Sequence, residues 1–136
     1  MGTAHRYIGY RGSRYSVAAC ETDGKCQFEE FLRANTETAP AVVGRIISLL
    51  TWVADNGLSG DDIDQCRLAD EAKSNDLYAL SVGGIRVLCF AYHKTLIVCS
   101  ATYFSSQEQY DSDIENALAL KTACEVVRYG VFRRTK

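Results

Sequence analysis

The chain has 136 residues, of which 47% are hydrophobic and 24% are charged, and its formal net charge is −2 at pH 7. These proportions are those of a globular protein, and the length suits one domain built around one core. A slightly acidic chain is a poor match for a protein that binds nucleic acid through a broad basic face. No apolar run approaches the roughly 20 residues that span a bilayer, so we expect no membrane segment.

The N-terminal sequence MGTAHRYIGYRGSRYS lacks the apolar core of a secretory signal, so we expect a cytoplasmic protein. Six cysteines are present without a C-x-x-C pair, and four lie in apolar segments, which favours buried free thiols. The two histidines, His5 and His93, are too far apart to complete a zinc site by spacing. We therefore expect no metal, no cofactor and no disulfide partner, with all six thiols titratable after unfolding.

Charged residues are unevenly distributed along the chain, with acids concentrated in the central segment GDDIDQCRLADE. If the two ends come together, their basic residues form one patch on an acidic protein, and otherwise they are two solvated tails. We expect a flexible N-terminal tail at 1–13, a single domain at 14–130 and a basic C-terminal tail at 131–136. The basic residues near the ends are Arg6, Arg11, Arg14, Arg128, Arg133, Arg134 and Lys136.

The domain is predicted to begin with a strand and a helix. RYSVAACE, residues 14–21, alternates partly between polar and apolar residues and is followed by the turn TDGK, which predicts a strand. In the next segment, Phe28, Phe31 and Leu32 are spaced as one face of an amphipathic helix that should end near Asn35.

A second helix is predicted from Pro40, which suits a first helical turn, to Asn56, because Gly57 can end the helix in a left-handed conformation. The two helices are expected to pack as a hairpin. Trp52 lies in line with Leu49 and Val53 on the apolar side of the helix, so we expect its ring in the core.

The remaining elements are a polar loop, three strands and a helix. Residues 58–76 are irregular, whereas LYALSV, IRVLCFAY and TLIVCSATYF are β-rich runs separated by GG and HK, which predicts an antiparallel meander. DSDIENALALKTACEVVRYG has helical spacing and acids in its first turn. The predicted order is β-α-α-β-β-β-α, an α+β fold. The N-terminal helices are expected to cover an apolar sheet face formed by Leu88, Phe90, Ile97 and Cys99.

Three segments in this order resemble the RelE/ParE superfamily of type II toxins, and more narrowly its HigB-like branch, which includes phage-derived proteins. They are DGKCQFEEFL, similar to the strand-turn-helix opening of the family; LYALSVGGIRVLCFAY, similar to "lyELR…g.iRvLyf"; and YFSSQEQYDSDIENALALK, similar to "gF.KKtqktp..eI..A". The resemblance implies a RelE-like fold in which an antiparallel sheet is combined with an N-terminal helical hairpin and a C-terminal helix.

The resemblance also implies an endoribonuclease that cleaves mRNA on the ribosome and is inhibited by a small antitoxin protein, often of the helix-turn-helix type. In that chemistry the RNA 2′-hydroxyl attacks the adjacent phosphate, so the site supplies a base, an acid and a cation without a metal. Arg86 occupies the position of the phosphate-binding arginine of the family, a role that suits the planar guanidinium. Strand alternation alone also explains Arg86 as a residue on the solvent side of the sheet.

The chain departs from the family at two places. Ala79, Leu80 and Ser81 replace the family's Glu-Leu-Arg, and serines replace its pair of basic residues after the last strand. Substitutes for the lost groups are available, although polar residues at a hairpin tip and tyrosine rings packed on a surface need no functional explanation. The candidate catalytic residues are Arg86, Arg67, Lys73 and Tyr110, with Tyr103 nearby in sequence, and the candidate RNA-binding residues are His93, Lys94, Ser105 and Ser106.

These departures leave other functions open. The main alternative is a catalytically silent RelE-fold protein that acts by binding, either as a ParE-like gyrase poison or as a phage protein that binds a host component. A protein with a small-molecule pocket is a further alternative, but the chain has no Gly-rich phosphate loop and no carboxylate pair that would support it.

Overall fold

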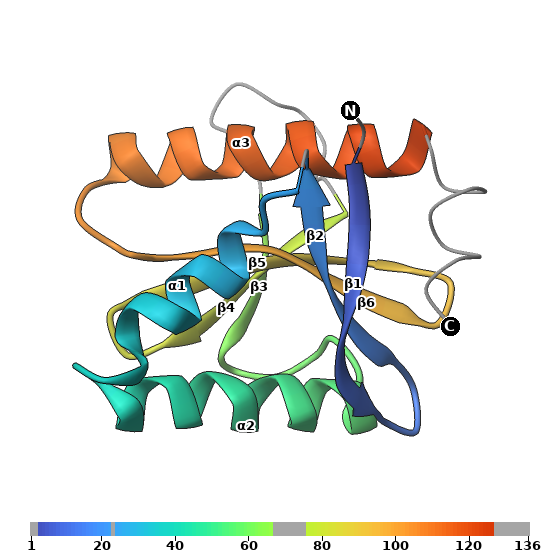
Figure 1. Cartoon of the computed structure of the whole chain (residues 1–136), viewed down its shortest axis with the longest axis horizontal. Coiled ribbons are helices and arrows are strands. Elements are labelled where there is room, and N and C mark those ends of the chain that lie inside the picture. Colours follow the sequence, from blue (N-terminus) through green and yellow to red (C-terminus); the bar gives the residue numbers. More distant parts are fainter. Residues whose placement is uncertain (1–2, 23, 67–75, 127–136) are drawn as a thin grey trace.

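The computed structural model describes residues 3–22, 24–66 and 76–126. A six-stranded sheet with strand order β1-β2-β6-β5-β4-β3 forms the middle layer (Figure 1). Helices α1 and α2 lie on one side of the sheet and α3 on the other. The elements are β1 (Thr3–Arg11), β2 (Ser16–Thr22), α1 (Gln27–Thr36), α2 (Pro40–Asn56), β3 (Ile63–Gln65), β4 (Leu77–Val82), β5 (Ile85–Tyr92), β6 (Thr95–Tyr103) and α3 (Gln107–Val126).

The predicted α+β class is confirmed, including the helical hairpin, the β4-β5-β6 meander and the C-terminal helix. Local chemistry explains this success. The turns of the meander contain Gly83 at φ +59° and His93 at φ +55°, both in the left-handed region that a tight turn requires. The sheet is nevertheless mixed, because β2 and β6 are parallel, whereas the sequence predicted an antiparallel sheet. Parallel pairing joins strands far apart in the chain, and no local pattern reports it.

The helical hairpin packs on one face of the sheet. Helix α1 buries Phe28, and α2 buries Ile46, Leu50 and Val53, which follow one another at helical spacing. The N–H of Gly57 donates to the carbonyl of Val53 at 2.8 Å, so α2 ends where the sequence predicts. Together with the inward residues of β4, β5 and β6, these side chains form the first of two core clusters.

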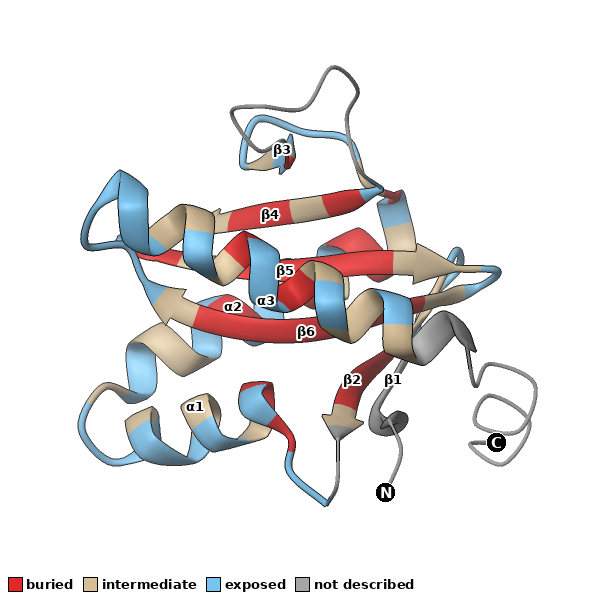
Figure 2. Ribbon diagram, turned by 90° about the horizontal axis from the view of Figure 1, so that it is seen from above, coloured by how far each residue is buried: buried red, intermediate tan, exposed pale blue. Residues whose placement is uncertain are grey.

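The second core cluster lies on the opposite face, under α3. It contains Leu88, Phe90, Ile97 and Cys99, which pack against Ile114 and Ala117 of α3. The prediction that these four strand residues share an apolar face is confirmed, but the prediction that the N-terminal helices cover it is wrong. Figure 2 shows the central strands buried along most of their length, as expected for strands that are covered on both faces.

The N-terminal segment is also structured, contrary to the predicted tail at 1–13. Thr3–Arg11 form β1, which pairs antiparallel with β2, and the register shifts between Tyr7 and Tyr10. This irregularity breaks the alternation by which a strand is recognised in a sequence. Within the predicted loop 58–76, Ile63–Gln65 form β3, a short edge strand paired with β4. The predicted basic tail at 131–136 lies outside the described residues.

Trp52 is not in the core as predicted, because 45% of its side chain is exposed. The buried stripe of α2 runs through Ile46, Leu50 and Val53, and Trp52 lies about 100° around the helix from Val53. Its ring therefore emerges at the flank of the helix. None of the helices within the described ranges is long and apolar enough to span a membrane.

Candidate functional site

Arg86 lies on β5, where it pairs with Ser81 of β4 and Thr102 of β6. Its neighbours Ile85 and Val87 belong to the core under α1 and α2, so alternation directs Arg86 to the α3 side of the sheet. The sheet is covered there as well, and Arg86 is only half-buried, at the margin of the second core cluster. The arginine is therefore placed at the edge of a covered face rather than on a free solvent face.

Two kinds of contact hold the Arg86 guanidinium. Its Nη1 donates to the carbonyl oxygens of Gly83 and Ile85, both at 3.3 Å. Its Cζ lies 5.3 Å from the centre of the Phe104 ring, within the range of a cation–π contact. Phe104 is 42% exposed and follows directly after β6. Phe104 was not among the candidates predicted from the sequence. Its position between the last strand and the last helix was the feature that could have indicated it.

Tyr110, in the first turn of α3, completes this group of side chains. Its ring contacts the Phe104 ring with centres 5.7 Å apart, and its hydroxyl lies 3.9 Å from the Cys66 Sγ. Burial raises the pKa of Tyr110 well above its usual value, and Cys66 raises it further, whereas the charge of Arg86 lowers it. Tyr110 therefore keeps its proton near neutral pH and can serve as a donor but not as a base.

Cys66 is a buried thiol at the base of this group. Burial raises its pKa to about 11, the contact with Tyr110 opposes this rise, and the charge of Asp64 adds to it. A thiol with such a pKa is a poor nucleophile at neutral pH. Five cysteines are buried and form no disulfide within the described residues, and the titration of all six thiols stays a prediction; the five are Cys20, Cys26, Cys66, Cys89 and Cys99.

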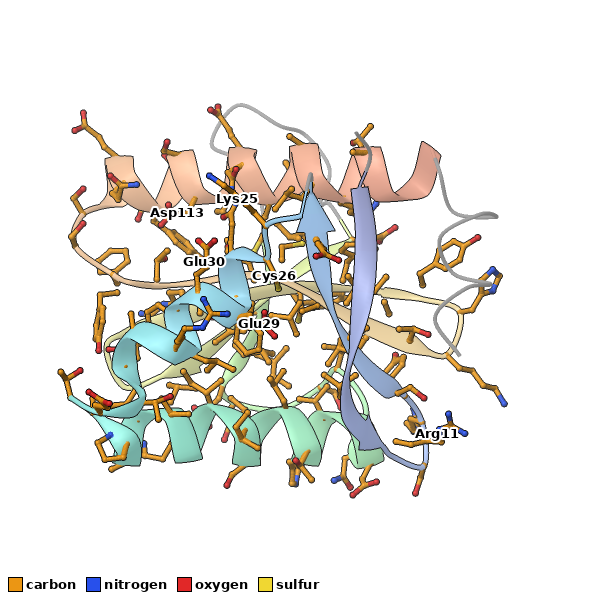
Figure 3. All side chains as sticks on the ribbon, in the orientation of Figure 1. Arg11, Lys25, Cys26, Glu29, Glu30 and Asp113 are labelled. Atoms are coloured by element: carbon orange, nitrogen blue, oxygen red, sulfur yellow. The ribbon has the colours of Figure 1, made fainter. Side chains whose placement is uncertain are left out.

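The start of α3 is joined to β6 by a hydrogen-bonded carboxylate. Thr102 donates to Asp113 Oδ2 at 2.9 Å, and the Gln109 side chain donates to Asp113 Oδ1 at 3.1 Å. Asp113 lies on the sheet side of α3 (Figure 3). Because Thr102 pairs with Arg86, this link fixes the helix next to the arginine. The sequence analysis missed it, since it depends on how α3 docks on the sheet.

Four of the remaining candidates lie at two places in the structure. Ser105 and Ser106 are exposed just before α3, and the Ser106 hydroxyl accepts the N–H of Gln109 at 3.1 Å, which makes it a helix cap. His93 and Lys94 form the turn after β5, at the opposite end of that strand from Arg86. The structure thus brings Tyr110 and the serines to the Arg86 end of the sheet and separates His93 and Lys94 from it.

Arg67 and Lys73 lie outside the described residues, so their roles stay predictions. Of the basic residues near the N-terminus, Arg11 lies at the far end of the β1–β2 hairpin, well away from Asp113 in Figure 3. Within the part of the chain that the structure describes, no group of three or more His, Cys, Asp or Glu side chains could hold a metal ion.

No family model and no curated protein matches this chain. Solved structures do match. The YoeB dimer from Staphylococcus aureus superimposes with a TM-score of 0.53 and 16% identity, over 68% of this chain and 100% of that chain. The YoeB–YefM complex from Staphylococcus aureus gives a TM-score of 0.52 at the same identity and coverage. This chain has the fold of YoeB. At this level of identity the likeness concerns the fold alone.

Proposed function

We propose that this chain is the toxin of a type II toxin–antitoxin system, an endoribonuclease that cleaves mRNA on the ribosome without a metal. The observation that carries the proposal is the half-buried Arg86, held against Phe104 at the start of α3. The fold adds support, because YoeB is a toxin of the RelE superfamily and one matching structure contains it together with YefM. A small antitoxin is therefore the expected partner, and the HigB-like assignment rests on the sequence motifs.

In the proposed reaction the RNA 2′-hydroxyl attacks the adjacent phosphate, the bond to the 5′-oxygen breaks, and negative charge grows on the phosphate oxygens. The role of Arg86 is to stabilise this charge. Its Nη1 already faces two carbonyl oxygens, so the other N–H groups of the guanidinium are the ones that bind the phosphate. Phe104 positions the guanidinium, because the ring limits its movement on one side.

Tyr110 is the candidate acid that protonates the leaving 5′-oxygen. Its raised pKa keeps it protonated, and the nearby charge of Arg86 is the one influence that favours its ionised form. Arg67 and Lys73 remain candidates for assisting residues. Phe104 is 42% exposed beside the guanidinium, and an exposed aromatic ring beside a cation is suited to stacking with an unpaired base, whereas Tyr103 packs on Phe31 of α1 and donates its hydroxyl to Asn35. Single-stranded mRNA is thus the substrate that fits this end of the sheet.

A catalytically silent protein that acts by binding is the second candidate. It is favoured by the Ser106 hydroxyl, which caps α3, and by the Tyr110 hydroxyl, which already contacts Cys66. Serines also replace the two basic residues of the family at 105 and 106. A ParE-like or host-directed binding protein would keep the fold without using Arg86 in a reaction.

The test is cleavage of ribosome-bound mRNA by wild type, Arg86→Lys and Arg86→Ala, with growth arrest on expression as a second measurement. Loss of one hydrogen-bond donor to the transition state typically lowers the rate by a factor of about 10² to 10³. The cleavage rate of Arg86→Ala should therefore be lower than that of wild type by this factor. Arg86→Lys should recover only part of the rate, because lysine cannot bind two phosphate oxygens in the same way. Arg33→Ala, an exposed arginine on α1, is the matched control and should leave the rate unchanged.

Equal activity of wild type and Arg86→Ala would contradict the proposed reaction. If wild type cleaves nothing, Ser105→Lys restores one basic residue and leaves the Ser106 cap intact. Cleavage gained in this variant and lost again with Arg86→Ala would indicate a dormant nuclease. No gain would favour the binding protein.

A further inference from the structure

A groove that plays no part in the proposed reaction runs along the outer flank of α2. It has a volume of about 300 Å³ and is lined by Leu49, Trp52, Gly60, Asp61, Asp62 and Ile63. A neighbouring hollow of about 310 Å³ shares Leu49 and Asp62 and continues the groove toward Arg45. We call the first of these the Trp52 groove. It lies between α2 and the edge strand β3, on the opposite side of the sheet from α3.

The apolar wall of the Trp52 groove is already formed in the chain alone. A Cβ added at Gly60 would lie 3.6 Å from the Trp52 ring and 3.8 Å from Ile63, so the indole lies beside Gly60 with room for a methyl group between them. Gly60 has φ +154°, a conformation that other residues rarely adopt. Trp52 is nevertheless 45% exposed, which is unusual for so large a side chain. The ring therefore presents an exposed apolar surface in the groove.

The rim of the Trp52 groove is acidic. Asp61 and Asp62 line it and are exposed. No ion pair joins these two carboxylates to another residue in the described ranges. The groove thus combines an apolar wall with two carboxylates, and Arg45 lines only the adjoining hollow. Such a surface repels phosphate groups and attracts cations.

We propose that the Trp52 groove docks a polypeptide segment of a partner protein, in which a large apolar side chain lies next to Arg or Lys. The apolar side chain packs on Trp52, Leu49 and Ile63, and the basic residues face Asp61 and Asp62. Aromatic anchors in preformed pockets supply most of the affinity of such interfaces, and rim charges supply specificity. The negative rim disfavours RNA, so this surface is separate from the substrate site proposed around Arg86.

The groove can be tested by fluorescence, because Trp52 is the single tryptophan of the chain. The intact protein is titrated with three capped synthetic peptides: Gly-Lys-Leu-Phe-Arg-Lys-Gly, its acidic counterpart Gly-Glu-Leu-Phe-Glu-Glu-Gly, and the apolar-deleted Gly-Lys-Ala-Ala-Arg-Lys-Gly. The first peptide should shift the Trp52 emission to shorter wavelength in a saturable way, because its apolar residues exclude water from the indole. The other two should produce no saturable shift.

Substitutions in the Trp52 groove test whether the peptide binds there, and the affinity of each variant is measured by calorimetry. Asp61→Asn combined with Asp62→Asn should weaken the binding of the basic peptide roughly three- to tenfold, since each exposed charge pair contributes modestly. Trp52→Ala should weaken it by at least about tenfold. The matched controls are Glu37→Gln, an exposed acid at the end of α1, and Ile47→Ala, which is 43% exposed on α2 but does not line the groove. Both controls should bind as wild type.

Three results would overturn the proposal. One is the absence of any saturable shift up to about 1 mM of the basic peptide, a limit that corresponds to negligible affinity. Another is equal binding of the acidic peptide. The third is a change in Trp52 emission, without peptide, when the chain is truncated after Val126, since that would mean that its own C-terminal residues occupy the groove. None of these measurements depends on RNA cleavage, so the proposal and the proposed function can fail separately.

Discussion

The two faces of the sheet are packed by the same kinds of element but contain different chemistry. Under α1 and α2 the core consists of aliphatic and aromatic side chains with two cysteines, and Phe28 and Ile46 are its large buried members. Under α3 the core includes three buried thiols and is bordered by Tyr110. At one end, the core under α3 is bordered by the Arg86 guanidinium. Polar chemistry is thus concentrated on one face, at the end where α3 begins.

This difference shows where a small domain can place a partly buried charged group. An arginine in the middle of either face would be fully desolvated, at a cost of several kcal/mol. At the end of β5 the guanidinium keeps contact with water and is still fixed by the Phe104 ring and two carbonyl groups. The face under α1 and α2 has the role of stabilising the domain, and the edge of the α3 face is available for function.

The largest expected effect tests the face under α1 and α2. Phe28→Ala removes a ring that is fully buried, so it should lower the free energy of unfolding by about 3–5 kcal/mol. Trp52→Ala, on the exposed flank of α2, should lower it by less than about 1 kcal/mol. Urea unfolding followed by circular dichroism measures both. Equal losses would show that Trp52 belongs to the core after all.

A slightly smaller effect is expected on the opposite face. Ile114→Ala creates a cavity under α3 and should cost about 2–4 kcal/mol. Because Ile114 packs in the cluster that contains Cys66 and Cys99, the native protein should also react faster with a thiol reagent. Glu115→Ala, an exposed neighbour on α3, is the control for both measurements. An unchanged thiol reaction rate would mean that α3 does not protect these cysteines.

Alkaline pH should weaken the α3 face through its thiols. Burial raises the pKa of Cys66 from 9.0 in the unfolded chain to about 11. Its contribution to stability is therefore complete below pH 9 and is lost as the pH rises from 9 to 11. The loss amounts to about 3 kcal/mol, because one pKa unit corresponds to about 1.4 kcal/mol.

The pH effect is measured as the difference in unfolding free energy between pH 8 and pH 11. Cys66→Ala should have a lower free energy of unfolding than wild type at pH 8. Between pH 8 and pH 11, however, its free energy of unfolding should decrease by less than that of wild type. The buried Cys89 and Cys99 also have raised pKa values and continue to contribute in this variant. Identical losses in the two proteins would show that Cys66 does not titrate as proposed.

The smallest predicted effect concerns the link between β6 and α3. Thr102→Val removes the hydrogen bond to Asp113 and keeps the shape of the side chain, so it should cost about 1 kcal/mol. Ser48→Ala, at an exposed hydroxyl on α2, should stay within roughly 0.5 kcal/mol of wild type. Thermal unfolding distinguishes the two. If Thr102→Val has no larger effect than the control, the Thr102–Asp113 contact contributes nothing to the docking of α3.

The sequence by itself determined most of the elements of this protein. Both helices of the hairpin begin and end within about one residue of their predicted limits, because Pro40, Gly57 and the spacing around Phe28 act over a few residues. The meander was predictable for the same reason. Strand alternation also predicted correctly that Arg86 points away from Ile85 and Val87, whereas its role in a site stays a prediction.

Only the tertiary structure decided which helix covers which face. Leu88, Phe90, Ile97 and Cys99 form an apolar face that any amphipathic helix could bury, and the chain uses α3. The same docking places Phe104 over Arg86, Tyr110 beside Cys66 and Asp113 under Thr102. On the other face, the packing of α2 through Ile46, Leu50 and Val53 leaves Trp52 at the flank of the helix. The spacing of residues along a helix or strand predicts which side chains lie on the same face of that element. Which other element packs on this face depends on contacts between segments far apart in the chain, and no local sequence pattern predicts them.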